Sequence, residues 1–130
     1  MQLNELAREQ YCYLTTTGRV SGEPREIEIW FALTSAEADD AGRSPRATLY
    51  MVAGGGLASN WVRNLRKTPR CTVRIDSETF PGVAHALAPG QPDDALARRL
   101  LFEKYSPGYS GSLEGWARDG LPVAIDLELD

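Results

Sequence analysis

The sequence predicts a mainly β fold with flanking helices (α+β), an antiparallel barrel of about six strands in a single domain spanning residues 1–130. Three observations lead to this prediction. Short segments alternate apolar and polar residues, tight glycine or proline turns join them, and helical segments come only at intervals, without the strand–helix–strand rhythm of a parallel sheet. A chain of 130 residues can bury one hydrophobic core without disulfides.

The first half of the chain alternates between strand and turn patterns. YCYLTTT (11–17) is rich in aromatic and β-branched residues, which favours a strand. After the turn GRVSGEP, the segment REIEIWFAL (25–33) places Ile27, Ile29 and Phe31 on one face and predicts one continuous, half-buried strand. The other expected elements are a short helix at 3–10, a surface loop at 35–46, a strand at 47–53 that ends in three glycines, and a helix at 59–68.

The second half continues the pattern and adds the longest helix. RCTVRID (70–76) alternates apolar and polar residues, and ETFPGVAHALA (78–88) contains Pro81-Gly82, which indicates a bulge or an edge position. A helix over 93–105 is expected to be capped by Asp93 or Asp94. The tail PVAIDLELD predicts a half-buried final strand.

Net charge, apolar runs and the content of cysteine and histidine argue against several classes of protein. A net charge of −4 argues against general nucleic-acid affinity, and no apolar run approaches the roughly 18 residues of a membrane span. The polar N-terminus does not resemble a signal or transit peptide. Cys12 and Cys71 form no CxxC pair, so we expect two free thiols in a reducing cytoplasm. A single histidine, His85, predicts no metal cluster.

Two blocks of sequence carry a family resemblance. LTTTGRVSGEPR (14–25), followed by a glycine-rich strand end and then by WVRNLRKTPRCTVRI (61–75), is similar to the deazaflavin (F420)-dependent nitroreductase/quinone reductase family. The likeness runs from about Tyr13 to Leu127 and leaves out the loop at 35–46. The resemblance implies a split β-barrel related to the FMN-binding barrels. It also implies that reduced coenzyme F420 donates hydride to a small electron acceptor, namely a quinone, a nitro compound or an activated alkene.

The resemblance also implies roles for individual residues. Arg19, Ser21 and Arg25 would hold the anionic tail of the coenzyme, because guanidinium groups bind phosphate and carboxylate with planar, charge-assisted hydrogen bonds. The coenzyme would further contact five residues at and after the end of the third strand, where glycine amides precede a helix N-terminus. These are the backbone at Ala53, Gly54 and Gly55, and the side chains of Trp61 and Asn64.

Tyr105 and Tyr109 resemble the tyrosine-bearing segment that closes over the substrate in this family. A phenol near the hydride acceptor can donate a proton or a hydrogen bond. The alternative is that both tyrosines pack under a loop. Glu26 and Glu28 likewise leave two interpretations open: carboxylates that face solvent, or a carboxylate on the ligand side of the strand.

Two departures from the family pattern remove positive charge from the expected tail site. Val20 replaces a basic residue in the turn, and three glycines at 54–56 stand where relatives often carry a lysine; Arg63 or Arg66 would have to compensate. Two further hypotheses therefore stay open, an FMN-dependent oxidase or reductase of the same barrel class and a coenzyme-binding protein without catalysis. Split barrels often dimerise, which favours a homodimer.

Overall fold

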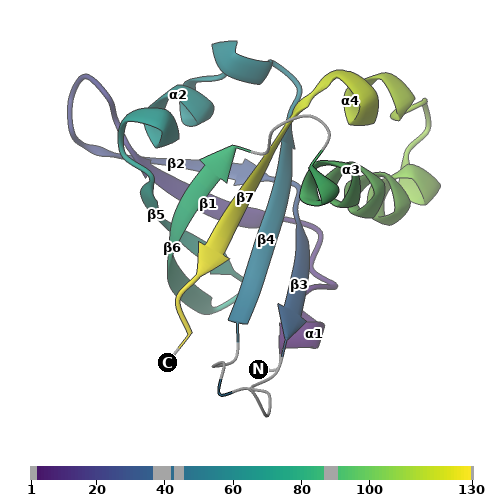
Figure 1. Ribbon diagram of the computed structural model, residues 1–130, viewed down its shortest axis with the longest axis horizontal. Coiled ribbons are helices and arrows are strands. Elements are labelled where there is room, and N and C mark those ends of the chain that lie inside the picture. Colours follow the sequence, from purple (N-terminus) through teal and green to yellow (C-terminus); the bar gives the residue numbers. More distant parts are fainter. Residues whose placement is uncertain (1–2, 37–41, 43–45, 87–90, 130) are drawn as a thin grey trace.

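The computed structural model describes residues 3–36, 42, 46–86 and 91–129, and its centre is one curled antiparallel sheet of seven strands (Figure 1). The strands are β1 (Cys12–Thr17), β2 (Pro24–Ile29), β3 (Ala32–Ala36), β4 (Arg46–Ala53), β5 (Arg70–Ile75), β6 (Glu78–Ala86) and β7 (Leu121–Leu127). The helices are α1 (Leu3–Leu6), α2 (Asn60–Lys67), α3 (Pro92–Tyr105) and α4 (Glu114–Asp119), with short 3-10 turns η1 (Gly56–Ala58) and η2 (Ser106–Gly108). None of the described helices is long and apolar enough to cross a membrane.

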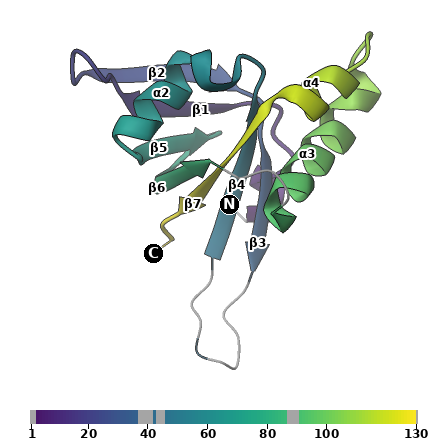
Figure 2. The ribbon, with the colours of Figure 1, turned by 45° about the horizontal axis from the view of Figure 1, so that its top comes forward.

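The strand order explains why the sheet curls. Its order is β2-β1-β5-β6-β7-β4-β3, so β2 and β3 form opposite edges. Only Trp30 and Phe31 separate these two strands in the chain. Because two residues cannot span an open seven-stranded sheet, the edges must approach each other. Figure 2 shows β1 and β2 running across the direction of β3 and β4. The predicted split barrel is confirmed.

The segment 25–33 is therefore two strands, and the expected continuous strand was wrong. This division raises the count from about six strands to seven. The break comes at Phe31, whose backbone N–H donates to the Tyr105 hydroxyl (2.9 Å) and whose carbonyl accepts from Lys104 Nζ (2.9 Å). Side chains of α3 thus satisfy backbone groups that a strand partner would otherwise have bound.

Two apolar clusters lie on the two faces of the sheet. The larger fills the inside of the curl and includes Leu14, Phe31 and Ile125, with Val62 and Leu65 of α2 covering it. The smaller lies between the outer face of β3, β4 and β7 and the helices α3 and α4. Ala124 of β7 belongs to this second cluster and is fully buried. The final strand is consequently buried on both faces along its middle, not half buried as the alternation predicted.

Several element boundaries also differ from the expectations. The first helix ends at Leu6, and α3 is capped by Gln91, with Pro92 as its first residue, rather than by Asp93 or Asp94. Helix α4 was not predicted at all. The strand expected at ETFPGVAHALA is β6 over its described residues; it lies between β5 and β7 rather than at an edge, and Pro81 stands just before the point where pairing with β7 begins. Most of the loop at 35–46 and residues 87–90 fall outside the described residues.

Candidate functional site

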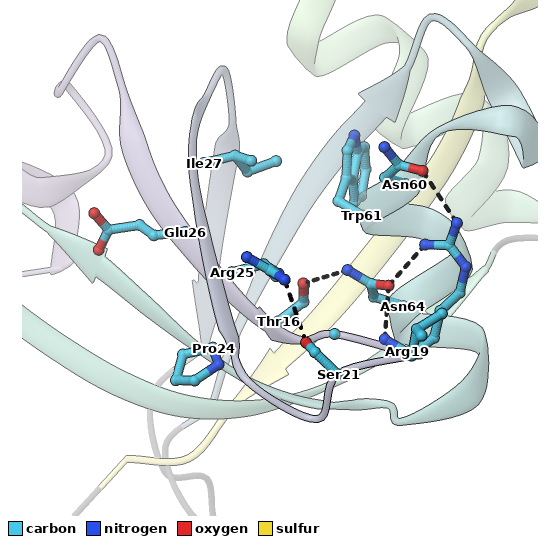
Figure 3. A pocket seen from close by; sticks show the side chains of 12 residues that line it. Thr16, Arg19, Ser21, Pro24, Arg25, Glu26, Ile27, Asn60, Trp61 and Asn64 are labelled. Carbon is cyan, nitrogen blue, oxygen red and sulfur yellow. Dashed lines mark hydrogen bonds between the residues drawn. The ribbon is translucent and has the colours of Figure 1, made fainter.

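A pocket of about 620 Å³ lies between the β1–β2 hairpin and α2 (Figure 3). The hairpin contributes Arg19, Ser21 and Arg25, and α2 contributes Asn60, Trp61 and Asn64. All five tail-site and coenzyme side chains that the sequence predicted, Arg19, Ser21, Arg25, Trp61 and Asn64, therefore line one pocket. Its volume is in the range of small-molecule and cofactor sites, roughly 300–1,000 Å³.

The two glycines of the hairpin allow the turn to bring its polar groups together. Gly18 N–H donates to the carbonyl of Glu23, and Gly22 N–H donates to the carbonyl of Gly18, both at 2.8 Å. A Cβ on Gly18 would lie 2.8 Å from Ser21 Oγ and 3.4 Å from Arg25 Nε, so only glycine permits this close approach. Gly22 has φ +73°, a left-handed conformation that glycine adopts without strain.

Neutral oxygens hold Arg19. Its Nη1 donates to Asn64 Oδ1 at 2.9 Å, its backbone N–H donates to the same oxygen at 3.2 Å, and its Nη2 donates to Asn60 Oδ1 at 3.2 Å. Lys67 Nζ approaches from the solvent side and donates to the Arg19 carbonyl at 2.7 Å. No carboxylate of the described residues forms an ion pair with Arg19, so its positive charge is available to a ligand.

Arg25 is arranged in the same way at the other side of the turn. Its Nη2 lies 3.3 Å from Ser21 Oγ, and that hydroxyl oxygen also accepts from the Glu23 backbone N–H at 3.1 Å. Within the described part of the chain, Arg25 has no carboxylate at ion-pair distance. The pocket thus presents two guanidinium groups and a hydroxyl, a donor set suited to an anion.

Two apolar side chains line the pocket beside the arginines. Ile27 of β2 and Trp61 of α2 point toward each other across the pocket, while the Glu26 side chain leaves β2 on the other side (Figure 3). Glu28 lies on the same side of β2 as Glu26, and its carboxylate accepts from the Tyr13 hydroxyl at 2.9 Å. Neither carboxylate is directed at the space that Arg25 and Ile27 face.

The predicted backbone contacts after β4 are not part of this pocket's lining. Ala53 is buried, with 2% of its surface exposed, and pairs with Leu121 of β7. Gly54 packs against the Trp116 ring, since a Cβ there would lie 3.3 Å from Trp116 Cδ1. The carbonyl of Gly55 accepts from the Ala58 N–H within the turn of η1. Coenzyme contacts at these three residues stay predictions.

The two predicted catalytic tyrosines have different surroundings. Tyr105 is 3% exposed, and besides accepting from Phe31 N–H, its hydroxyl lies 2.9 Å from the Gln10 carbonyl and 3.0 Å from the Phe31 carbonyl. Burial raises its pKa to about 12. Tyr109 is 47% exposed and meets the edge of Trp30 at a centroid distance of 6.1 Å. The Tyr105 hydroxyl is thus bound by backbone groups, Tyr109 is accessible, and neither tyrosine lines the pocket, so their catalytic roles stay predictions.

Sequence reasoning gave no ligand role to Asn60, Ile27 or Thr16, which also line the pocket. Ile27 was expected only on the apolar face of its strand, and Thr16 breaks the apolar series of Cys12 and Leu14 on the buried face of β1. That polar residue in a buried position was the available signal. The basic run of 63–74 does not act as one patch, because Arg70 pairs with Glu128 and Arg74 lies over the Tyr13 ring.

The chain matches the family model described as F420H(2)-dependent quinone reductase over residues 3–128. The chain belongs to this family. Membership makes it an F420H2-dependent oxidoreductase, as the resemblance of the hairpin and helix blocks implied. No curated protein matches the chain.

Solved structures share the fold of this quinone reductase family member. An F420-H2 dependent reductase (FDR-A) has a TM-score of 0.61 at 21% identity, covering 92% of this chain and 94% of that one. The heme storage protein HutZ from Vibrio cholerae scores 0.68 at 14% identity, covering 98% and 89%. A FAD-binding protein from Mesorhizobium loti scores 0.63 at 16% identity, covering 99% and 90%. One fold thus accompanies different cofactors, so the fold alone does not select the ligand.

Proposed function

We propose that this chain binds reduced F420 in the pocket between the hairpin and α2 and passes its hydride to a small, mostly apolar acceptor, which is a quinone, a nitro compound or an activated alkene. The anionic tail would bind to Arg19, Ser21 and Arg25, and the ring system would lie along Trp61 and Ile27. The observation that supports this proposal is the pair of guanidinium groups that face one pocket without a carboxylate partner among the described residues.

The residues present fit such a coenzyme at both ends. A phosphate or carboxylate requires charge-assisted donors, which the hairpin supplies. A planar ring requires an apolar surface, which Trp61 and Ile27 supply. When bound, reduced F420 supplies the hydride, and the protein contributes binding, orientation and exclusion of water.

A proton must also reach the reduced acceptor, and we assign its delivery to Tyr109 rather than Tyr105. The Tyr105 hydroxyl is already occupied by backbone groups of Phe31 and Gln10. No described residue binds the Tyr109 hydroxyl, and its ring stands beside Trp30 at an exposed corner. Tyr109→Phe should lower turnover by about a hundredfold, the lower range for general acid catalysis, without weakening F420 binding. Tyr11→Phe, another exposed tyrosine, is the control.

The proposal is tested by two measurements on the purified protein. The first titrates F420 and FMN separately and follows their fluorescence. The second follows oxidation of reduced F420 with a panel of quinones, nitro compounds and activated alkenes. We expect tighter binding of F420 and turnover with at least one acceptor class. Tighter FMN binding would support the oxidase hypothesis, and F420 binding without turnover would support a binding protein.

A further inference from the structure

Two polar side chains are buried beside the pocket, at the junction of β1 and α2. Thr16 is 2% exposed and Asn64 is 5% exposed, and among the described residues they are the polar or charged side chains in the buried class. Their neighbours on the same elements, Leu14 and Leu65, belong to the apolar core. Buried polar groups are costly unless they are hydrogen-bonded, so the contacts of this pair should show what it does.

The contacts form one chain from the core to the pocket (Figure 3). Asn64 Nδ2 donates to Thr16 Oγ1 at 3.1 Å, and Asn64 Oδ1 accepts from both the backbone N–H and Nη1 of Arg19. The direction of the amide is determined by chemistry. Arginine offers only donors, so the amide oxygen must face Arg19 and the amide nitrogen must face Thr16.

We infer that Asn64 is a positioning residue for Arg19, and that it does not itself bind the coenzyme as the family resemblance had implied. Its carbonyl oxygen accepts two hydrogen bonds from Arg19, one of its two amide N–H groups donates to Thr16, and only 5% of the residue is exposed. The inference rests on the proposed function, because it takes Arg19 to be the group that binds the anionic tail. Holding the long arginine side chain before the ligand arrives lowers the entropy lost on binding.

The neutrality of the amide matters as much as its position. A carboxylate at residue 64 would accept the same two hydrogen bonds and would neutralise the guanidinium. Asn64 and Asn60 instead hold Arg19 with uncharged oxygens, so the full positive charge remains for an anion. The affinity of the site for a charged tail therefore depends in part on Asn64, which acts through Arg19.

A double-mutant cycle on the full chain distinguishes positioning from direct contact. The dissociation constant of oxidised F420 is measured by fluorescence for the wild type, Arg19→Ala, Asn64→Leu and the double variant. We expect each single variant to bind about tenfold or more weakly, in line with the loss of a charge-assisted hydrogen bond, and the double variant to bind no more weakly than Arg19→Ala. If the fold-losses of the two single variants instead multiply in the double variant, the inference is overturned, because an amide that contacts F420 directly would contribute to affinity with or without Arg19.

The cycle also separates failure of the inference from failure of the proposed function. Unchanged affinity in Arg19→Ala would refute the tail site itself. A clear loss of affinity in Arg19→Ala, together with a double variant in which the two single losses multiply, would refute only the role of Asn64. Asn60→Ala, which removes a single exposed contact of Arg19 at 3.2 Å, should cause a smaller loss than Asn64→Leu.

Two further variants keep the test decisive. If Asn64→Leu does not fold, Thr16→Val can replace it, because this variant removes the hydrogen bond that Asn64 Nδ2 donates to Thr16. Thr16→Val should weaken F420 binding in the wild-type background but not in the Arg19→Ala background. Asn64→Asp should keep Arg19 in place but weaken F420 binding and flatten its dependence on salt, because the guanidinium charge is compensated. An Asn64→Asp variant with unchanged affinity and salt dependence would contradict the argument from neutrality.

Discussion

Arg19 and Lys104 are both held by neutral oxygens, but they lie in regions with different roles. At the pocket, Arg19 donates to the amide oxygens of Asn60 and Asn64 and faces a space of about 620 Å³. At the bend between β2 and β3, Lys104 donates to the carbonyl of Phe31 and lies 3.8 Å from the centroid of the Phe31 ring. Arg19 faces a space that a ligand can enter, whereas Lys104 is half-buried and already bound to Phe31.

The surroundings of each cation determine whether it binds a ligand or stabilises the fold. Burial lowers the pKa of Lys104 to about 8, an effect that the aromatic ring beneath it opposes. Together Lys104 and Tyr105 satisfy both backbone groups of Phe31, which lets the chain leave one sheet edge and enter the other. The bend region should therefore control stability, and the pocket should control ligand affinity.

The largest effect is expected from Tyr105→Phe, which removes the hydroxyl that links α3 to the bend. The buried N–H of Phe31 would lose its partner, so the free energy of unfolding should fall toward the upper end of about 1–3 kcal/mol. Urea unfolding measures this loss. F420 affinity should stay near the wild-type value. An equal loss of affinity and stability would contradict the statement that the bend controls stability and the pocket controls affinity.

Arg25→Ala tests the pocket from the opposite direction. Its side chain is exposed and bonds only to Ser21 among the described residues, so stability should change by less than about 0.5 kcal/mol. F420 binding should weaken by about 1–3 kcal/mol, the range for a charge-assisted hydrogen bond, as calorimetry can measure. Arg99→Ala, an exposed arginine on α3, is the matched control. Equal affinities of both variants would remove Arg25 from the tail site.

The lowered pKa of Lys104 predicts a dependence of stability on pH. Between pH 8 and the unfolded value of 10.5, the unfolded state binds the proton more strongly, so this residue's contribution to stability rises with pH. Above pH 9 the buried thiol of Cys12, whose pKa burial raises to about 12, acts in the opposite direction. The useful window is therefore pH 8–9. Between pH 8 and pH 9, the free energy of unfolding of the wild type should rise by up to about 1 kcal/mol relative to that of Lys104→Met. Urea unfolding at both pH values measures this change, and an equal response of the two proteins to pH would contradict the assignment.

The smallest effect concerns salt and the choice of coenzyme. A long anionic tail makes more contacts with exposed cations than the single phosphate of FMN does, and such contacts are individually weak and screened. The preference for F420 over FMN should therefore shrink by a few fold between low and high ionic strength. Titrating both coenzymes at two salt concentrations measures this change. A preference that does not respond to salt would mean that the ring, rather than the tail, discriminates.

Local sequence patterns determined a large part of this protein. Alternation located the strands, Gly18 and Gly22 marked the hairpin, and the spacing of Trp61 and Leu65 marked α2, because these signals arise from neighbouring residues whose geometry is set by the backbone. The family resemblance also named Arg19, Ser21, Arg25, Trp61 and Asn64 together, and the structure brings these five residues to one pocket.

Only the tertiary structure shows which distant side chains contact one another. The break at Phe31 depends on Tyr105, 74 residues away, and the position of Arg19 depends on Asn64, 45 residues away. Alternation along REIEIWFAL reports which face is apolar but not which backbone groups lack a strand partner. Likewise, the sequence alone does not show whether an asparagine in a motif contacts the coenzyme or holds an arginine. Only the three-dimensional positions of distant side chains distinguish the two, because hydrogen bonds require atoms to meet within about 3 Å.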